Sequence, residues 1–295
     1  MSDNIPIQNP NQVRKSESLT PEQIEALQRD ASKAQESTPK QESKFPTEII
    51  ELPSEGFFYD QESPLASGKI ELKYMTAKEE DILTSQNLIK KGIVLDKLLD
   101  ELIVTPGVSS KDLLVGDRNA IFIAARILAY GSKYDAKVTC PKCGAESEVS
   151  IDLSYMANKE FDFSGFTRGV NEFYFELPKS KRNIGYKILT GHDESAIEQE
   201  SKAMAKINKN GPSSEVTTRL KYLITSVDGK SDRNYIKKFV DTELTSIDAR
   251  ELRKNMKEAS PDFDMSFNFE CEHCGYEGRI PMPMGVNFFW PDAEI

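Results

Sequence analysis

The 295-residue sequence is poor in residues that commonly carry catalysis, with two histidines, four cysteines and one tryptophan. It has no Gly-rich phosphate loop, no His-Glu-x-x-His pair and no Gly-x-Ser-x-Gly elbow. His192 falls in the first turn of a predicted helix, and His273 lies between two cysteines, so neither has the setting of a catalytic base. Acid pairs such as Glu79-Glu80 are explained as first-turn helix residues. The sequence therefore predicts a protein that is not an enzyme and has no small-molecule substrate.

Long apolar runs and an excess of positive charge are also missing. No apolar stretch approaches the roughly 20 residues that span a bilayer, and the N-terminus lacks the apolar segment of a signal peptide. Because 48 Asp and Glu outnumber 38 Lys and Arg, the net charge is −10. This balance disfavours nucleic acid as the main partner. We therefore expect a soluble chain without a membrane or nucleic-acid role.

All four cysteines fall into two Cys-x-x-Cys-Gly motifs, at residues 140–144 and 271–275. Two residues between the thiolates let both sulfurs face one ion, and the glycine lets the backbone turn toward them. Each motif supplies half of a tetrahedral site, so together they predict one structural Zn²⁺ per chain. The predicted ligands are Cys140, Cys143, Cys271 and Cys274. Because four sulfurs fill the shell, His273 is not a predicted ligand, and no position remains for water or substrate.

The segments around both motifs have the composition of strands, so each motif, or knuckle, is predicted at the tip of a hairpin. Between Cys143 and Cys271 lie 127 residues (271 − 143 − 1), so the metal would join distant parts of the chain. A disulfide framework does not fit, because nothing indicates secretion. A thioredoxin-like redox pair and four unrelated buried cysteines are the alternatives that the sequence leaves open.

Residues 1–44 are rich in Ser, Gln, Asn, Pro and Glu. Such a composition buries too little apolar surface to offset chain entropy, so this segment is predicted to be a disordered arm. A short helix is predicted near residues 20–33, with Thr20 as N-cap and Pro21 in the first turn. Ile24 and Leu27 form its apolar stripe. They indicate either a fraying turn in a linker or a helix that docks on a partner.

The remainder of the chain shows two related halves, at residues 45–160 and 161–295. Each half has a Glu-Leu-Pro segment (residues 51–53 and 176–178), a short strand, a Thr-capped helix, further helices and a knuckle hairpin. Either duplication or chance similarity explains this order. The predicted fold class is α+β, with two related repeats that each end in a zinc-knuckle hairpin and together form one zinc-ribbon-like four-cysteine site.

The C-terminal segment carries three consecutive aromatic residues, Phe288, Phe289 and Trp290. They indicate either a tail that folds back over the core or an exposed aromatic anchor, since a partner that buries large aromatics gains much binding energy.

Several short motifs follow one another along the chain. They are Glu51–Gly56, Ile70–Tyr74, Thr76–Glu80, Val138–Pro141 and the late strand-knuckle-strand segment that ends in Phe288-Phe289. In this order they resemble the baseplate hub assembly proteins of T4-like contractile-tailed bacteriophages, over about residues 46–291. Members of that family often lack one or more knuckle cysteines, so the zinc prediction depends on this sequence alone. The N-terminal arm also departs from the family pattern.

The resemblance implies a non-enzymatic structural or assembly protein of the phage tail baseplate that contacts other baseplate or tail proteins. It would act in the host cytoplasm during assembly and stand in the tail baseplate of the virion. The predicted partner-contact residues are Ile24, Leu27, Phe288, Phe289 and Trp290. Two alternatives are a tail-assembly chaperone that is absent from the mature virion and a zinc-ribbon adaptor in transcription or nucleic-acid binding.

Overall fold

The structure is a computed structural model that describes residues 46–207, 214–284 and 288–289. By contacts the chain divides into residues 1–44 and residues 45–295, and every described residue belongs to the second unit. The predicted contact residues Ile24, Leu27 and Trp290 lie outside the described residues. Among the helices that the structure does describe, none has the length and apolar character needed to cross a membrane.

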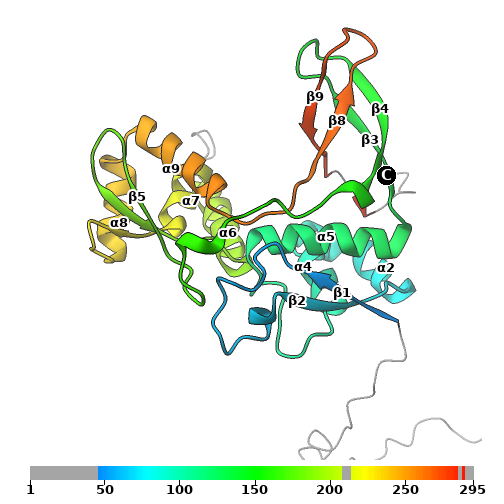
Figure 1. The fold of residues 1–295 in the computed structure, drawn as a ribbon, viewed down its shortest axis with the longest axis horizontal. Coiled ribbons are helices and arrows are strands. Elements are labelled where there is room, and N and C mark those ends of the chain that lie inside the picture. Colours follow the sequence, from blue (N-terminus) through cyan, green and yellow to red (C-terminus); the bar gives the residue numbers. More distant parts are fainter. Residues whose placement is uncertain (1–45, 208–213, 285–287, 290–295) are drawn as a thin grey trace, which may run out of the picture. The chain divides into compact units, whose positions relative to one another are not determined.

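The first half of the described chain combines short antiparallel strands with helices (Figure 1). Its elements are β1 (Thr47–Glu51), β2 (Lys69–Lys73), α2 (Ala77–Leu83), α3 (Gln86–Lys91), α4 (Val94–Leu102), α5 (Val115–Tyr130), β3 (Lys133–Thr139) and β4 (Glu146–Asp152). Strands β1 and β2 pair with each other, and β3 pairs with β4. A single antiparallel bridge between Leu72 and Ile103 adds the end of α4 to the β1–β2 sheet.

The second half has a similar order. Its elements are β5 (Phe173–Glu176), β6 (Asn183–Tyr186), α6 (Gly191–Ile207), α7 (Glu215–Leu223), β7 (Ile224–Val227), α8 (Arg233–Thr242), α9 (Ser246–Glu258), β8 (Ser266–Glu270) and β9 (Glu277–Pro281). Strands β5, β6 and β7 form a three-stranded antiparallel sheet, and β8 pairs with β9. Helices mixed with small antiparallel sheets confirm the predicted α+β class.

Helix α2 begins with the predicted Thr cap, which is part of a capping box. The carboxylate of Glu79 accepts a hydrogen bond from the backbone N–H of Thr76 at 2.8 Å, while the Thr76 side chain caps the first turn. Lys73, at the end of β2, forms an ion pair with the same carboxylate at 2.9 Å. Burial opposes ionisation of Glu79, but these hydrogen bonds from Thr76 and Lys73 outweigh it and lower the pKa of Glu79 to about 2.

Helix α6 begins with the same arrangement. The carboxylate of Asp193 accepts from the backbone N–H of Thr190 at 3.0 Å, and Lys187, near the end of β6, forms an ion pair with it at 2.8 Å. In both cases the lysine is three residues before the threonine, and the acid is three residues after the threonine. The first α-helix of each half therefore begins with the same local arrangement of hydrogen bonds and an ion pair.

A fully buried carboxylate fixes the start of α5 to the turn after β1. Asp117, the third residue of α5, accepts from the backbone N–H of Ser54 at 2.8 Å, from its hydroxyl at 2.7 Å and from the Tyr59 hydroxyl at 2.6 Å. Burial raises the pKa of Asp117 despite these bonds. Because its bonds span more than 50 positions of sequence, Asp117 anchors the turn that contains Leu52 and Pro53.

Asp248 plays the same part in the second half. It is the third residue of α9, and it accepts from the backbone N–H groups of Lys179 at 2.8 Å and Ser180 at 3.2 Å. The Thr245 hydroxyl donates a further bond at 3.0 Å. These donors hold the turn after β5, which contains the second Leu-Pro pair. Each half thus ties its Leu-Pro turn to the third residue of its last helix.

The aromatic C-terminal segment packs into the core. Phe288 and Phe289 are 1 % and 2 % exposed. The ring of Phe289 contacts that of Phe122 on α5 at 5.9 Å between centroids, and the ring of Phe288 contacts that of Tyr134 on β3 at 5.2 Å. The interpretation of these two phenylalanines as an exposed anchor is therefore wrong, because α5 and β3 offer them an apolar surface within the same chain.

Candidate metal centre

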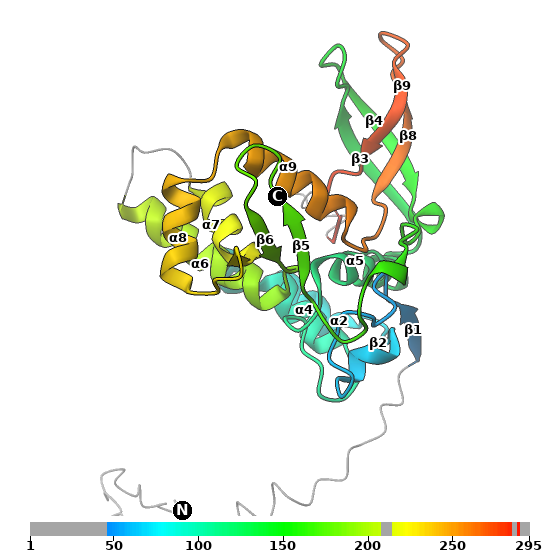
Figure 2. The same ribbon diagram turned by 60° about the vertical axis from the view of Figure 1, so that its left-hand side comes forward.

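Two antiparallel hairpins carry the cysteine motifs at their tips and lie side by side, as both views show (Figures 1 and 2). Strands β3 and β4 pair without interruption from Lys133 opposite Asp152 to Thr139 opposite Glu146. Strands β8 and β9 pair from Ser266 opposite Pro281 to Glu270 opposite Glu277. The predicted hairpins are confirmed.

The two knuckles have the same backbone hydrogen bonds. In the first, Cys140 N–H donates to Ala145 O at 2.8 Å, and Gly144 N–H donates to Cys140 O at 2.9 Å. In the second, Cys271 and Gly275 make the corresponding bonds at 2.8 and 2.9 Å. Both glycines have positive φ angles, 75° for Gly144 and 62° for Gly275, which residues with a side chain rarely adopt.

The four sulfurs converge on one point. All of them lie within 4.8 Å of one another. Cys140 Sγ is 3.7 Å from Cys274 Sγ, and Cys143 Sγ is 3.7 Å from Cys271 Sγ. A tetrahedral ion with metal–sulfur distances of roughly 2.3 Å separates its sulfurs by about 3.8 Å. The shortest contacts are much too long for a disulfide, whose S–S bond is about 2.05 Å. The four cysteines therefore have the spacing of ligands to one metal ion.

A small apolar cluster of its own supports the cysteine site. Val138, Phe269 and Ile280 pack together with the buried Cys140 and Cys271. Cys143 is exposed and Cys274 is half-buried, so one side of the site faces solvent. Two-stranded hairpins are marginally stable by themselves. Five buried residues therefore make only a small core for the two tips.

The surroundings shift the pKa values of Cys140 and Cys274 in opposite directions. Burial opposes ionisation of Cys140, but hydrogen bonds from the N–H groups of Cys143 and Lys142 outweigh it and lower its pKa to about 6. Burial, together with hydrogen bonding to the sulfurs of Cys143 and Cys140, raises the pKa of Cys274 to about 12. A divalent cation favours the thiolate form of both residues, because it deprotonates the thiols that bind it. His273 is not part of the cluster that the structure brings together.

The cysteine cluster was within reach of sequence reasoning, but two other features were not. The pairing of Asp117 and Asp248 with the Leu-Pro turns had one signal, an acid at the third position of a helix, which is common at exposed helix starts. An apolar groove between α7 and α9 had less signal still. Its α9 wall includes Arg253 and Lys257, so the helix has the sequence pattern of a solvated surface.

The described chain is thus an α+β protein in which two hairpins, far apart in sequence, close on one four-cysteine site able to bind a metal. The family model described as "T4 bacteriophage base plate protein" matches residues 57–290. Because the match covers most of the chain, the protein belongs to this family of phage base plate proteins. No curated protein and no solved structure matches the chain.

Proposed function

We propose that this protein is a non-enzymatic structural or assembly component of the central hub of a contractile phage tail baseplate. The observation that carries the proposal is the family match over residues 57–290. Its partners would be other baseplate or tail proteins, bound through protein surfaces instead of through chemistry on a substrate. It would meet them in the host cytoplasm during assembly and stay in the virion tail.

A single structural Zn²⁺ per chain is the second part of the proposal. The sulfur separations of 3.7 Å match a tetrahedral four-thiolate ion, and thiolates favour zinc over harder cations. When bound, zinc supplies charge neutralisation and a cross-link between hairpins β3–β4 and β8–β9. Four protein ligands leave no position for water, so the role that fits is structural. An iron ion has the same ligand preference, and metal analysis separates the two.

Internal duplication is the third part, and it is supported by a constant spacing. Asp117 and Asp248 are 131 positions apart (248 − 117), and so are Cys140 and Cys271 (271 − 140). From the third residue of the last helix to the knuckle, each half therefore has the same length. The backbone hydrogen bonds of the two knuckles repeat at this spacing. Each aspartate also accepts from the turn that follows its Leu-Pro pair, although these two turns are 125 positions apart (177 − 52).

The sheets support duplication as well. In the first half, Ile103, directly after α4, makes an antiparallel bridge with Leu72 of β2. In the second half, Ile224, directly after α7, pairs with Tyr186 of β6 and continues as strand β7. In each half, the residue directly after a helix thus pairs with the second strand of the sheet. This pairing is a single bridge in the first half and a full strand in the second. On this proposal, residues 45–160 and 161–295 are two copies of one α+β unit joined by the metal.

Affinity capture tests the functional proposal. Tagged protein expressed during infection should recover baseplate or tail proteins, and mass spectrometry of purified particles should detect the chain in the virion. Recovery of tail proteins together with absence from particles would favour a tail-assembly chaperone that leaves. Salt-sensitive binding of DNA by the purified protein at low micromolar concentration would favour the zinc-ribbon adaptor. Recovery of no tail protein would refute the proposal.

A further inference from the structure

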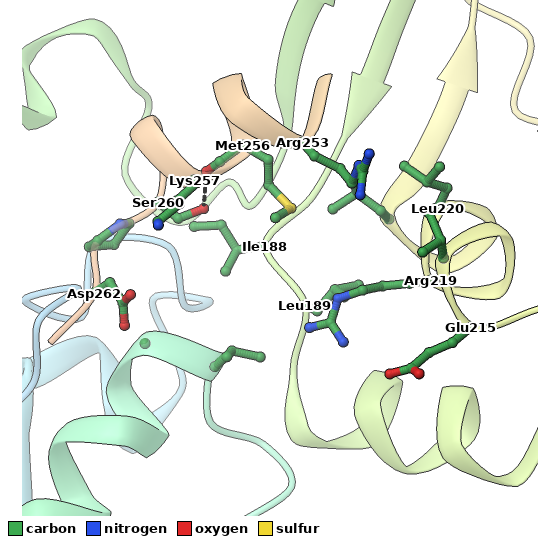
Figure 3. A pocket seen from close by; sticks show the side chains of 15 residues that line it. Ile188, Leu189, Glu215, Arg219, Leu220, Arg253, Met256, Lys257, Ser260 and Asp262 are labelled. Carbon is green, nitrogen blue, oxygen red and sulfur yellow. Dashed lines mark hydrogen bonds between the residues drawn. The ribbon is translucent and has the colours of Figure 1, made fainter. Parts of the chain in front are cut away.

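An apolar groove runs between α7 and α9 (Figure 3). It encloses a cavity of about 330 Å³, within the range of pockets that take a small molecule or a large side chain. Its apolar lining comes mainly from Val115, Ile188, Leu189, Leu220, Leu223 and Met256. In Figure 3, side chains of α9 form one wall and side chains of α7 form another.

The rim of this groove carries two cations without an ionic partner in the described part of the chain. Arg253 and Lys257 are both exposed on α9. Arg253 Nε donates a hydrogen bond to the backbone oxygen of Ala249, one turn earlier in the same helix. Glu215 also lines the groove, and two further charges at the rim are compensated. Arg219 pairs with Glu194, and Asp262 pairs with Lys159 at 2.9 Å.

The corresponding face of α5 is covered. At the spacing of 131 positions, Arg253, Met256 and Lys257 correspond to Phe122, Ala125 and Arg126 of α5. These three α5 residues are 7 %, 2 % and 3 % exposed, whereas on α9 the two cations are exposed and the methionine is half-buried. One helix face is thus part of the core in the first half and open in the second.

What covers the α5 face is known. Phe288 and Phe289 pack edge to face with each other at 4.8 Å, and Phe289 contacts Phe122 in the same way. The cover is therefore a short chain segment that inserts aromatic rings beside the helix. On α9, Arg253 stands where α5 has Phe122, and Lys257 stands where α5 has Arg126.

We propose that the groove between α7 and α9 binds a segment of a partner protein that inserts an aromatic side chain and places carboxylates beside Arg253 and Lys257. This inference rests on the proposed role in protein contacts and gives it a partner chemistry. The aromatic ring occupies the apolar cavity, and the carboxylates pair with the cations of Arg253 and Lys257. Hot spots of protein interfaces are enriched in buried aromatic residues and in arginine.

Fluorescence anisotropy of the purified, metal-loaded full chain tests the proposal. The probe is a labelled peptide, Gly-Asp-Glu-Phe-Phe-Asp-Glu-Gly, and its control is Gly-Lys-Lys-Phe-Phe-Lys-Lys-Gly. The acidic peptide should bind saturably and the basic peptide at least tenfold more weakly. Lys257→Glu should weaken binding of the acidic peptide by about tenfold, because an attraction becomes a repulsion.

Lys254→Glu is the matched control, since Lys254 is an exposed lysine on the same helix, α9, but does not line the groove. It should change the affinity less than twofold. Equal effects of both substitutions, or the absence of saturable binding, would overturn the proposal. A full-length dimer that Lys257→Glu dissociates, measured by light scattering, would also overturn it, because the occupant would then be a second copy. These measurements use purified protein, so their failure leaves recovery of tail proteins from infected cells as a separate result.

Discussion

The Sγ atoms of Cys140 and Cys274 lie 3.7 Å apart, although 134 positions separate the two residues in sequence. Cys143 and Cys271 form the second such pair across the hairpins. Each close pair thus joins the first cysteine of one knuckle to the second cysteine of the other. Because each hairpin carries two of the four cysteines, neither hairpin can complete the four-cysteine site alone.

Metal content follows directly from this geometry. Native mass spectrometry of the purified chain should find one zinc per protein chain. Cys143→Ser and Cys274→Ser should each lose the metal, because three thiolates from the chain leave the tetrahedral shell incomplete. His273→Ala should keep it, since this histidine lies outside the cluster. A metal-free wild-type chain with four reactive thiols would contradict the prediction.

Removing the metal should loosen the two hairpins before the helices. Structural zinc sites contribute on the order of 10 kcal/mol in small peptides, whereas the cluster around Val138 and Phe269 is small. Hydrogen exchange after treatment with a chelator should show lost protection in β3, β4, β8 and β9. Helix α5 should stay protected, because Ile121 and Ile123 belong to the main core. Uniform loss of protection would show that the metal controls the whole fold.

The buried aspartates Asp117 and Asp248 should contribute similarly to the stability of the folded protein. Asp117→Ala leaves the buried N–H group of Ser54 without an acceptor, and Asp248→Ala does the same to the part-buried N–H groups of Lys179 and Ser180. We expect each substitution to lower the free energy of unfolding by about 3 kcal/mol. Glu258→Ala, at an exposed position near the end of α9, should cost less than about 0.5 kcal/mol. Urea denaturation monitored by circular dichroism measures all three, and a large cost for only one aspartate would weaken the duplication.

Acid should weaken the start of α2 through Glu79. Its pKa in the folded protein is about 2, below the ordinary value of 4.5. The stabilisation from ionised Glu79 is therefore complete above about pH 4.5 and is lost as the pH falls toward 2. Glu79→Gln should cost about 1–2 kcal/mol at pH 7 and less at pH 3. Its exposed neighbour Glu80 provides the control. The change in unfolding free energy caused by Glu80→Gln should be the same at pH 7 and at pH 3.

The aromatic segment gives a direct test of the core. Phe289→Ala should lower the free energy of unfolding by about 3 kcal/mol, because it opens a cavity against Phe122. Tyr155→Ala removes a side chain that is 87 % exposed and should cost less than about 0.5 kcal/mol. Thermal or urea unfolding compares the two variants. Equal stability of both would mean that Phe289 is not part of the core in solution.

Local patterns predicted much of this protein. The Cys-x-x-Cys-Gly motifs indicated knuckles at hairpin tips, because two-residue spacing and a glycine act within one turn of backbone. The Thr76 cap was equally local, since its partner Glu79 is three residues away. The α+β class followed from short strand and helix patterns in each half. The zinc itself, the duplication and the contact roles of Ile24, Leu27 and Trp290 stay predictions.

By itself the sequence determined the interactions that depend on neighbours in the chain: caps, knuckles, hairpins and the pairing of cysteine motifs by count. The tertiary structure decided which surfaces are covered. Aromatic residues such as Phe289 have the same sequence signal whether a partner or the chain's own core buries them. Likewise, Arg253 of α9 corresponds to Phe122 of α5, but among residues 46–207, 214–284 and 288–289 an aromatic segment covers Phe122 and leaves Arg253 exposed. Burial of this kind depends on contacts between residues more than 150 positions apart, such as Phe122 and Phe289, and no local pattern encodes it.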